Sequence, residues 1–584
     1  MARYTIDVAR ERLVEMLAAR DVKVDPADVR DVDSDIGADL AVPLFRAARD
    51  LKQNPIQLAD KVAAELDLAG TPFSAVAALK GYLNFTLDPG PFVAGVFEDF
   101  ARTREDYGSR DDGKGSTVVI DYSSPNIAKP FSVGHLRSTI IGQALHNVLS
   151  RLGYRAVGDN HVGDWGTQFG KLLCAWSLWG DEAELDRGPT RHLLDLYVRF
   201  HEEAKADPSL ENKAREWFRR LEQGDPESRA RWQRFVEHST AEFARIYDLL
   251  GVEIDNQLGE SFYEDRLQGV IDRALESGVA RREKPLEPVN TGEEKVDEDE
   301  TVVLVPLDSE GIDTPLILQK SDGTSLYATR EIATADYRVE KWHPDRLVYV
   351  VGNEQEFYFR QFAAALKLLG HEEKVEHVSF GLIRLPEGRM STREGRVILL
   401  EDVIREAVSR AREVLADREM TEDEKDRVAR IVGIGALKYA DLSQNRVKDV
   451  VFSWDRMLAL DGDSAPYLQY AHTRCRSILR KAGDVNLAGC EPGALGKPGE
   501  LALVRRLARF PDAVRAAGRT CEPHRIANYL YRLAQEFSVF YNKVPVLKAE
   551  SGSARVARLR LVEMTGTVIR LGLGLLGIGV PEKM

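Results

Sequence analysis

Residues 123–139 read Ser-Ser-Pro-Asn-Ile-Ala-Lys-Pro-Phe-Ser-Val-Gly-His-Leu-Arg-Ser-Thr and follow an apolar run, residues 117–120. The apolar run is typical of a buried strand, and the segment from residue 133 onward indicates a helix. A polar turn between them aims free backbone N–H groups and the positive end of the helix dipole at one small volume. Lys129 and His135 lie on or beside this turn. The stretch therefore predicts a phosphate site at the edge of an α/β sheet.

This stretch also resembles the ATP-binding signature of class I aminoacyl-tRNA synthetases, in the version carried by arginyl-tRNA synthetases. The signature normally has two His flanking a small pair, and here Ser132 takes the first position while His135 keeps the second. A plain strand-to-helix turn with an incidental His is the alternative, which the length of the match disfavours. The resemblance implies that Ser132, Gly134 and His135 bind ATP. The Ser132 hydroxyl can bond a phosphate or ribose oxygen but carries no charge.

A second candidate nucleotide element is the charged segment Arg389-Met390-Ser391-Thr392-Arg393-Glu394-Gly395-Arg396, which follows the apolar residues 380–385. A short charged loop after a strand suits a lid over phosphates. It resembles a degenerate form of the Lys-Met-Ser-Lys-Ser loop of class I synthetases, whereas an isolated motif of this kind would be better interpreted as a surface turn. The resemblance implies that Arg389, Met390 and Ser391 bind ATP.

The resemblance also implies that Lys129 replaces the second Lys that this loop has lost. Oriented positive charge is the main catalytic contribution in phosphate transfer of this kind. We therefore expect Lys129, Arg389 and His135 to neutralise the triphosphate, with Ser132 and Ser391 as the other catalytic candidates.

The second substrate is expected to be a flat cation. A guanidinium offers five N–H donors in a planar fork, which paired carboxylates bind strongly. Tyr327 and Glu331 are four residues apart on a predicted helix and so share a face, and Gln355 follows an apolar strand, where α/β sheets place ligands. Each carboxylate alone is more often a surface residue. The candidates for the cation site are Asp121, Ser123, Asn126, Glu260, Tyr327, Glu331 and Gln355.

Two more segments resemble the same family. Residues 321–331 are similar to its arginine-recognition segment, with Glu331 where Asp is usual. Residues 160–170 are similar to a wall of its aminoacyl-adenylate pocket, which implies that Gly163 contacts ATP. We interpret His161 in that wall as a structural hydrogen-bonding group.

Composition bounds the class of protein. The 584 residues are too many for one core, and 43% hydrophobic with 30% charged residues is ordinary for a globular protein. The formal net charge is −14, but residues 427–584 hold 25 Lys and Arg against 14 Asp and Glu, or +11, which leaves −25 for the remainder. A basic C-terminal part can engage phosphates locally. A solvated basic face without a partner is the alternative.

Three domains are expected: an α+β domain over residues 1–112, a Rossmann-type parallel-sheet catalytic domain over 113–440, and an all-α domain over 441–584. The expected strands of the parallel sheet are 118–121, 156–160, 316–319, 347–351 and 378–383. The resemblance implies that the first domain binds the tRNA elbow, where Asn84 is placed against RNA, and that the last domain binds the anticodon. Stacking faces and phosphate partners there would be Tyr467, Tyr470, Arg474 and Arg476.

The resulting prediction is an arginyl-tRNA synthetase that uses ATP with Mg²⁺, L-arginine and tRNA(Arg). The four cysteines are far apart and form no Cys-x-x-Cys, so we expect no protein-bound zinc or other resident metal, and a reduced cytoplasmic protein. A monomer without membrane segments is expected. Two alternatives stay open: a class I synthetase for another amino acid, and a catalytically silent tRNA-binding paralogue, which Ser132, Arg389 and Thr392 would motivate.

Overall fold

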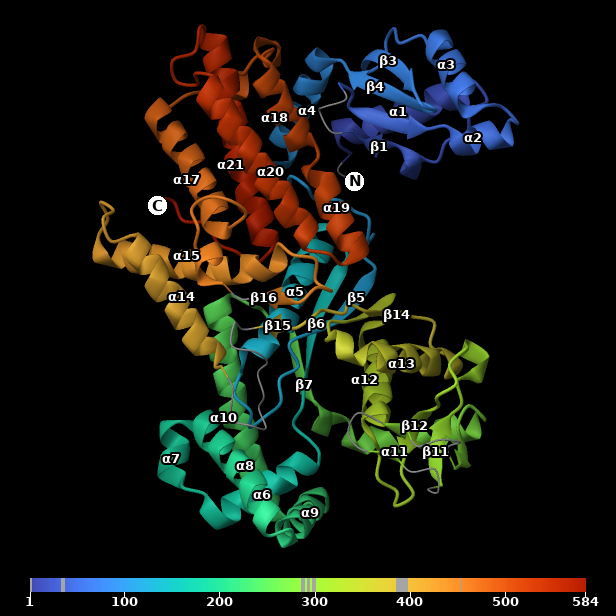
Figure 1. The fold of residues 1–584 in the computed structure, drawn as a ribbon, viewed down its shortest axis with the longest axis vertical. Helices are drawn as coiled ribbons and strands as arrows, with labels where there is room; N and C mark the ends of the chain where they lie inside the picture. Colours follow the sequence, from blue (N-terminus) through green and yellow to red (C-terminus); the bar gives the residue numbers. More distant parts are fainter. Residues whose placement is uncertain are drawn as a thin grey trace.

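The computed structural model describes residues 3–32, 37–284, 289–290, 295–296, 301–384, 398–451 and 453–584. Figure 1 shows a central sheet with a helical part above it, two lobes below it and the N-terminal domain to the upper right. No helix among the described residues is long and apolar enough to cross a membrane.

The central sheet is parallel and five-stranded, in the order β14-β13-β5-β6-β7. Its middle strand β5 is buried along its whole length, as expected for a parallel strand covered on both faces. Val118 and Ile120 of β5 share a hydrophobic core with helix α5, whereas Val119 belongs to the core of helices α12 and α13. The bounds are β5 (Thr117–Asp121), α5 (Val133–Arg151), β6 (Arg155–Val162), β7 (Asn256–Gly259), α12 (Tyr327–Trp342), β13 (Arg346–Tyr349), α13 (Glu356–Leu368) and β14 (Lys374–His377).

Two expected strands are placed differently in the structure. The segment 316–319 is strand β12 (Leu316–Gln319), but it belongs to an antiparallel sheet with β11 (Val302–Val305) and β8 (Arg281–Glu283). The prediction of one strand over 378–383 is wrong. The sheet strand there is β14, which ends at His377, and β15 (Ile383–Arg384) pairs instead with β16 (Val450–Val451). An apolar run predicts burial, but it does not identify the partner strand.

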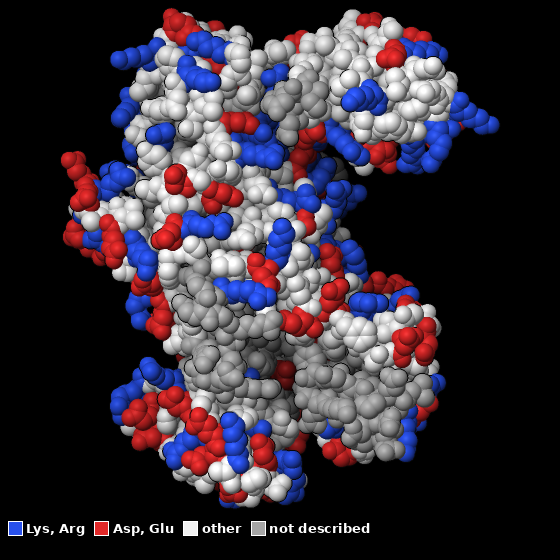
Figure 2. Space-filling view, viewed as in Figure 1, with Lys and Arg blue, Asp and Glu red and all other residues white. Residues whose placement is uncertain are grey.

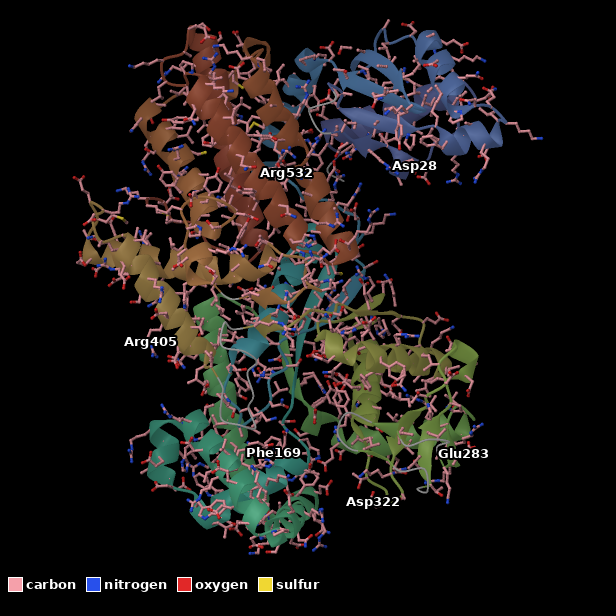
Figure 3. The ribbon with its side chains drawn as sticks, viewed as in Figure 1. Asp28, Phe169, Glu283, Asp322, Arg405 and Arg532 are labelled. Carbon is pink, nitrogen blue, oxygen red and sulfur yellow. The ribbon has the colours of Figure 1, made fainter. Side chains whose placement is uncertain are left out.

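The two lower lobes are insertions into the central sheet. One is the helical set α6 (Thr167–Trp179), α7 (Glu182–Arg187), α8 (Pro189–Ala206), α9 (Ser209–Glu222) and α10 (Pro226–Leu250). The other contains η4 (Glu260–Arg266), α11 (Leu267–Glu276), β8, β9 (Val289–Asn290), β10 (Lys295–Val296), β11, η5 (Asp308–Glu310) and β12. Figure 3 marks the first lobe by Phe169 and the second by Glu283 and Asp322.

The N-terminal domain is the predicted α+β unit, with a four-stranded antiparallel sheet in the order β1-β2-β4-β3. Its Asn84 is only 9% exposed and donates from its side-chain amide to the Ala77 carbonyl (3.4 Å), so this conformation does not favour a direct contact with RNA. The elements are α1 (Thr5–Ala18), η1 (Pro26–Asp28), β1 (Arg30–Asp31), β2 (Leu40–Pro43), α2 (Phe45–Asp50), α3 (Pro55–Glu65), β3 (Phe73–Leu79), β4 (Tyr82–Leu87), α4 (Pro89–Thr103) and η3 (Arg104–Asp106).

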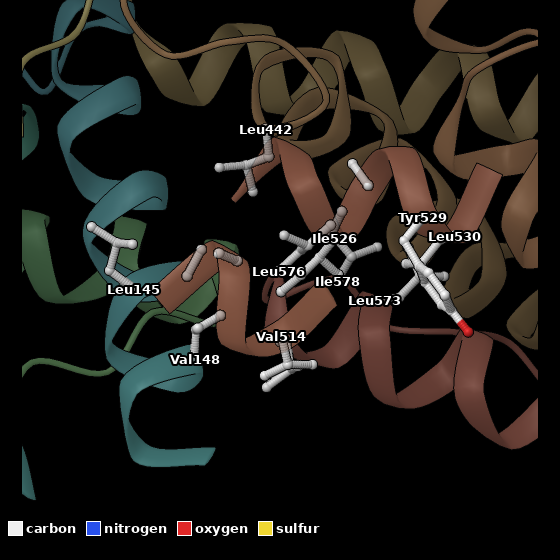
Figure 4. Packing of buried hydrophobic residues seen from close by; sticks show 14 of the residues in the cluster. Leu145, Val148, Leu442, Val514, Ile526, Tyr529, Leu530, Leu573, Leu576 and Ile578 are labelled. Atoms are coloured by element: carbon white, nitrogen blue, oxygen red, sulfur yellow. The ribbon is translucent and has the colours of Figure 1, made fainter. Parts of the chain in front are cut away.

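The C-terminal part is helical, as predicted, and its core is continuous with helix α5. Figure 4 shows Leu145 and Val148 of α5 facing this core. Its elements are α14 (Leu400–Val414), α15 (Glu422–Leu442), α16 (Trp454–Met457), α17 (Ala465–Ala482), η7 (Leu487–Gly489), η8 (Pro492–Ala494), α18 (Pro498–Ala508), α19 (Phe510–Thr520), α20 (His524–Lys543) and α21 (Gly552–Leu575).

Candidate active site

A cavity of about 850 Å³ lies at the carboxyl ends of β5, β6, β7 and β13. This is the edge at which parallel α/β sheets place ligands. Three of the residues predicted to bind ATP line it: Gly134, His135 and Gly163. All seven residues predicted for the cation site line it as well: Asp121, Ser123, Asn126, Glu260, Tyr327, Glu331 and Gln355. The structure thus brings both sets of candidates into one volume.

The turn between β5 and α5 is strained and held by several side chains. Ser123, Ser124 and Ala128 have φ values of 73°, 44° and 62°, in a region that side-chain-bearing residues seldom adopt. The Ser123 hydroxyl lies 2.8 Å from both the Thr139 and the Tyr247 hydroxyls, so its hydrogen bonds are made within the protein. Strain retained in such a turn is typical of a functional site.

The first signature position serves mainly as a helix cap. Ser132 is the N-cap of α5 and forms a capping box with His135, whose Nδ1 accepts a hydrogen bond from the Ser132 backbone N–H (3.1 Å). The Ser132 side chain is 8% exposed, and the described cavity wall includes His135 but not Ser132. The predicted direct contact of Ser132 with phosphate is therefore not favoured in this conformation.

His135 cannot supply the predicted positive charge in the ligand-free protein. Burial, and after it the positive charge of Lys129, lower the pKa of His135 to about 4. Because Nδ1 accepts a hydrogen bond, the proton of the neutral ring lies on Nε2. His135 can thus donate a hydrogen bond to a phosphate oxygen, while charge must come from other groups.

Lys129 lies on the same turn but faces the first helical lobe. Its ammonium nitrogen is 5.8 Å from the centre of the Tyr197 ring of α8, and the described cavity wall does not include it. Its predicted role at the triphosphate therefore requires a change of rotamer, which a long flexible side chain permits.

The second nucleotide element, with Arg389, Met390 and Ser391, lies outside the described residues. The described residues on either side of that segment, however, lie beside the first signature. The Leu400 N–H donates to the Phe131 carbonyl (3.0 Å), and the Val133 N–H donates to the Ile398 carbonyl (3.2 Å). On the other end, Arg137 of α5 donates to the Gly381 carbonyl (2.6 Å). Described residues that flank the second element on both sides therefore contact the first signature, more than 200 residues earlier in the sequence.

The carboxylate of Asp121 already has a partner inside the protein. The Arg338 guanidinium lies 2.8 Å from Asp121 and 2.8 Å from Asp159, and all three groups are buried. The prediction that Asp121 binds the cation directly is thus modified, because the Arg338 guanidinium already neutralises part of this acidic wall. Reasoning from the sequence missed Arg338 and Asp159. The signal was present, since Arg338 lies seven residues after Glu331 on the same helical face.

Glu331 is the carboxyl group best placed to meet an incoming cation. It is 2% exposed, lies on the cavity wall and interacts with the Tyr327 hydroxyl. Burial first, and the nearby Asp121 carboxylate second, raise the pKa of Glu331 to about 7. Glu260 lines the same wall and lies 3.5 Å from Arg330.

Gly163 keeps the opposite wall in place. A Cβ atom at this position would lie 2.2 Å from the Asn126 side-chain oxygen. The backbone of residue 163 bonds to that of Pro125 and Ile127, so the turn of the first signature rests on the end of β6. A side chain at position 163 would have to displace the Asn126 amide from this position.

Comparison with known proteins identifies the family. A model described as the catalytic domain of class I (R) tRNA synthetases matches residues 102–454, the arginyl tRNA synthetase N-terminal domain model matches 7–87, and the DALR anticodon binding domain model matches 468–584. The chain belongs to the class I arginyl-tRNA synthetase family. The Chloroflexus aurantiacus arginine–tRNA ligase is 43% identical over 571 residues, 96% of each chain, and that of Chloroflexus aggregans is 43% identical over the full length of both. The solved arginyl-tRNA synthetase of Thermus thermophilus superposes with a TM-score of 0.82 at 25% identity, covering 98% of this chain and 99% of that one.

At the start of the part that matches the family's anticodon-binding model, and one residue before it, three of the four predicted RNA-binding residues gather on one face of α17. The Arg474 guanidinium lies 5.1 Å from the Tyr470 ring and 5.2 Å from the Tyr541 ring, and the Tyr467 ring packs edge-on against Tyr531 of α20. Arg476 is separate: it lies on another face and pairs with Glu582 (3.1 Å).

Proposed function

We propose that the cavity holds ATP and L-arginine side by side and joins them as arginyl-adenylate. A carboxylate oxygen of arginine attacks the α-phosphorus, the bond from that phosphorus to the bridging oxygen breaks, and pyrophosphate leaves. A hydroxyl of the terminal ribose of tRNA(Arg) then attacks the arginyl carbonyl carbon and AMP leaves. Arginine–tRNA ligase activity is that of the family to which the chain belongs.

One observation carries this proposal: a single cavity has an acidic wall on one side and the N-terminus of α5 on the other. Glu331, Glu260 and Tyr327 suit the flat guanidinium of arginine. The positive end of the α5 dipole at Gly134, with the Nε2–H of His135, suits a phosphate.

The remaining charge would come from the two loops. We propose that Lys129 and Arg389 act at the triphosphate and that Met390 and Ser391 complete the nucleotide site, as the family resemblance implies. Mg²⁺ would enter with ATP and be held mainly by the phosphate oxygens, where it offsets their charge. We also propose that the protein works in the cytoplasm, which its free cysteines support, and as a monomer.

The proposal is tested by ATP–pyrophosphate exchange with each of the twenty amino acids, with and without total tRNA, together with charging of that tRNA. Exchange and charging with arginine alone are expected. Exchange with a different amino acid would point to another class I synthetase. Binding of tRNA without any exchange or charging would identify a silent paralogue, for which the matches to arginine–tRNA ligases offer no support.

A further inference from the structure

Arg137 is a fully buried cation two residues after His135 on α5, with 1% of its surface exposed. Its guanidinium donates to the carbonyls of Gly381 (2.6 Å), Lys448 (2.9 Å) and Arg446 (3.1 Å). The same group forms an ion pair with Asp441 at the end of α15, with the closest atoms 2.7 Å apart. A planar fork with five donors can meet several acceptors at once, which an ammonium group cannot.

The acceptors of Arg137 belong to segments with different tasks. Gly381 is four residues before the undescribed part that contains Arg389, so it is at the root of the second nucleotide loop. Residues 446–448 lead into β16, which pairs with β15 at that same root. A Cβ atom on Gly381 would lie 2.7 Å from the Lys448 carbonyl, so these two backbones touch directly.

The segment Asn445–Val451, here termed the joint segment, also reaches the cavity wall and the helical part. The Asn353 side chain donates to the Val447 carbonyl (3.1 Å), and Asn353 begins the turn that carries Gln355. At the other end, the Arg446 guanidinium donates to the Cys521 carbonyl (3.0 Å) at the end of α19. The cavity wall, the loop root and the anticodon-binding part therefore meet at one segment.

We infer that Arg137 is a positioning residue that fixes the joint segment, and through it the root of the second nucleotide loop and the Gln355 turn, relative to the ATP signature. A buried guanidinium that satisfies three main-chain carbonyls leaves those segments little freedom, because each unmet buried acceptor would be costly. The joint segment is also one route, beside the packing of α5 on the helical part, by which a change in that part would reach both substrates. This inference rests on the proposed function, since it assigns a role within that reaction.

The first test uses Arg137→Lys, which keeps a cation beside Asp441 but removes the fork. Arg558→Lys is the matched control, because Arg558 is equally buried, pairs with Glu500 and Glu550, and lies in α21 away from the cavity. Arg137→Lys is expected to lower kcat for arginine-dependent pyrophosphate exchange at least thirtyfold while tRNA affinity stays within threefold. Arg558→Lys is expected to lower the melting temperature about as much as Arg137→Lys does, while its kcat stays within threefold of the wild-type value.

A second variant keeps the inference testable if Arg137→Lys does not fold. Asn353→Ala removes only the bond between the Gln355 turn and Val447, and it is expected to raise KM for arginine at least threefold with little change in melting temperature. Asn147→Ala is its control, because the Asn147 amide also bonds a main-chain carbonyl, that of Gly574, but away from the cavity.

Kinetic constants for Arg137→Lys and Asn353→Ala that match their controls would overturn the inference, and the Asn353 pair decides alone if Arg137→Lys cannot be purified. A wild-type protein without arginine-dependent exchange would instead overturn the proposed function. If the wild type is active and the kinetic constants of both variants match their controls, only the role assigned to Arg137 and the joint segment is ruled out.

Discussion

In the proposed site, the Glu331 carboxyl group would link the ionisation of the protein to the binding of the cationic substrate. Its pKa of about 7 is raised above the ordinary value, so the free protein holds a proton there between about pH 4.5 and 7. An arriving guanidinium favours the carboxylate and must expel that proton. Folding stability follows the opposite direction: the contribution of Glu331 is fully present below the ordinary pKa and is lost as pH rises through 7.

We therefore expect KM for arginine to fall as pH rises from 6 to 7.5, approaching tenfold per pH unit below the pKa. KM for ATP, measured in the same exchange assays, is the internal control. In Glu331→Gln, arginine binding should be weaker and should lose this pH dependence. A KM for arginine that does not change between pH 6 and 7.5 in the wild type would show that Glu331 is not the group that meets the cation.

Lys129→Ala tests whether Lys129, on the turn before α5, supplies the positive charge of the Lys that the second nucleotide loop lacks. Because His135 is neutral, Lys129 should carry more of the charge opposite the triphosphate than the sequence indicated. We expect kcat for exchange to fall more than tenfold, or above about 1.4 kcal/mol. Lys171→Ala is the control, since the Lys171 ammonium also lies over a ring of α8, that of Phe200, at 5.9 Å. A loss no greater than that of Lys171→Ala would remove Lys129 from the mechanism.

The first turn of α5 joins helix stability to ligand geometry. In Ser132→Ala the capping box is lost, which should cost about 1 kcal/mol of unfolding free energy. The same change removes the Ser132 hydroxyl, which lies 3.3 Å from Nδ1 of His135, while the Ser132 N–H still bonds that nitrogen. The imidazole is then held less firmly, so KM for ATP should rise modestly. Thr421→Ala removes a second capping box, at the start of α15. It is expected to lower the unfolding free energy by a similar amount and to leave KM for ATP unchanged. Urea unfolding and exchange kinetics measure the two effects, and an unchanged KM for ATP in Ser132→Ala would contradict the second.

One side of the molecule presents an extended surface with many Lys and Arg side chains (Figure 2). Figure 2 shows Lys and Arg side chains along the hollowed right-hand side, between the N-terminal domain and the lobe below it. The N-terminal domain is tied to the helical part by the buried Arg110, which pairs with Asp7 and Asp512. A rigid connection of this kind lets separate basic surfaces act on one large anionic partner.

At this scale we expect Tyr470→Ala to weaken tRNA(Arg) binding by roughly 1–3 kcal/mol through the loss of a stacking face. Arg474→Ala should weaken binding and also reduce its salt dependence, because one phosphate partner is lost. Arg476→Ala is the control with the smaller expected effect, since Arg476 already pairs with Glu582. Filter binding at several salt concentrations measures all three, and equal losses at Arg474 and Arg476 would contradict the assignment of the α17 face.

Much of the site could be predicted from the sequence because it is built from local patterns. The strand, turn and helix around residues 117–151 are visible in hydrophobic periodicity and turn chemistry, and the carboxyl ends of parallel strands must meet at one edge. That is why residues as far apart as Asp121 and Gln355 could be assigned to one cavity. The α+β and helical flanking domains follow from the same kind of pattern.

Only the tertiary structure decided which of those groups are available and in what state. Asp121 is paired with Arg338, 217 residues away. The apolar segment 378–383 is divided: Phe380 forms a single bridge to Gly352 beyond β13, and Ile383 pairs with β16. His135 is neutral and Glu331 holds a proton at mildly acidic pH, since both are buried among particular charges. Charge state and pairing depend on through-space neighbours and on exclusion of water, and neither is encoded in local sequence spacing.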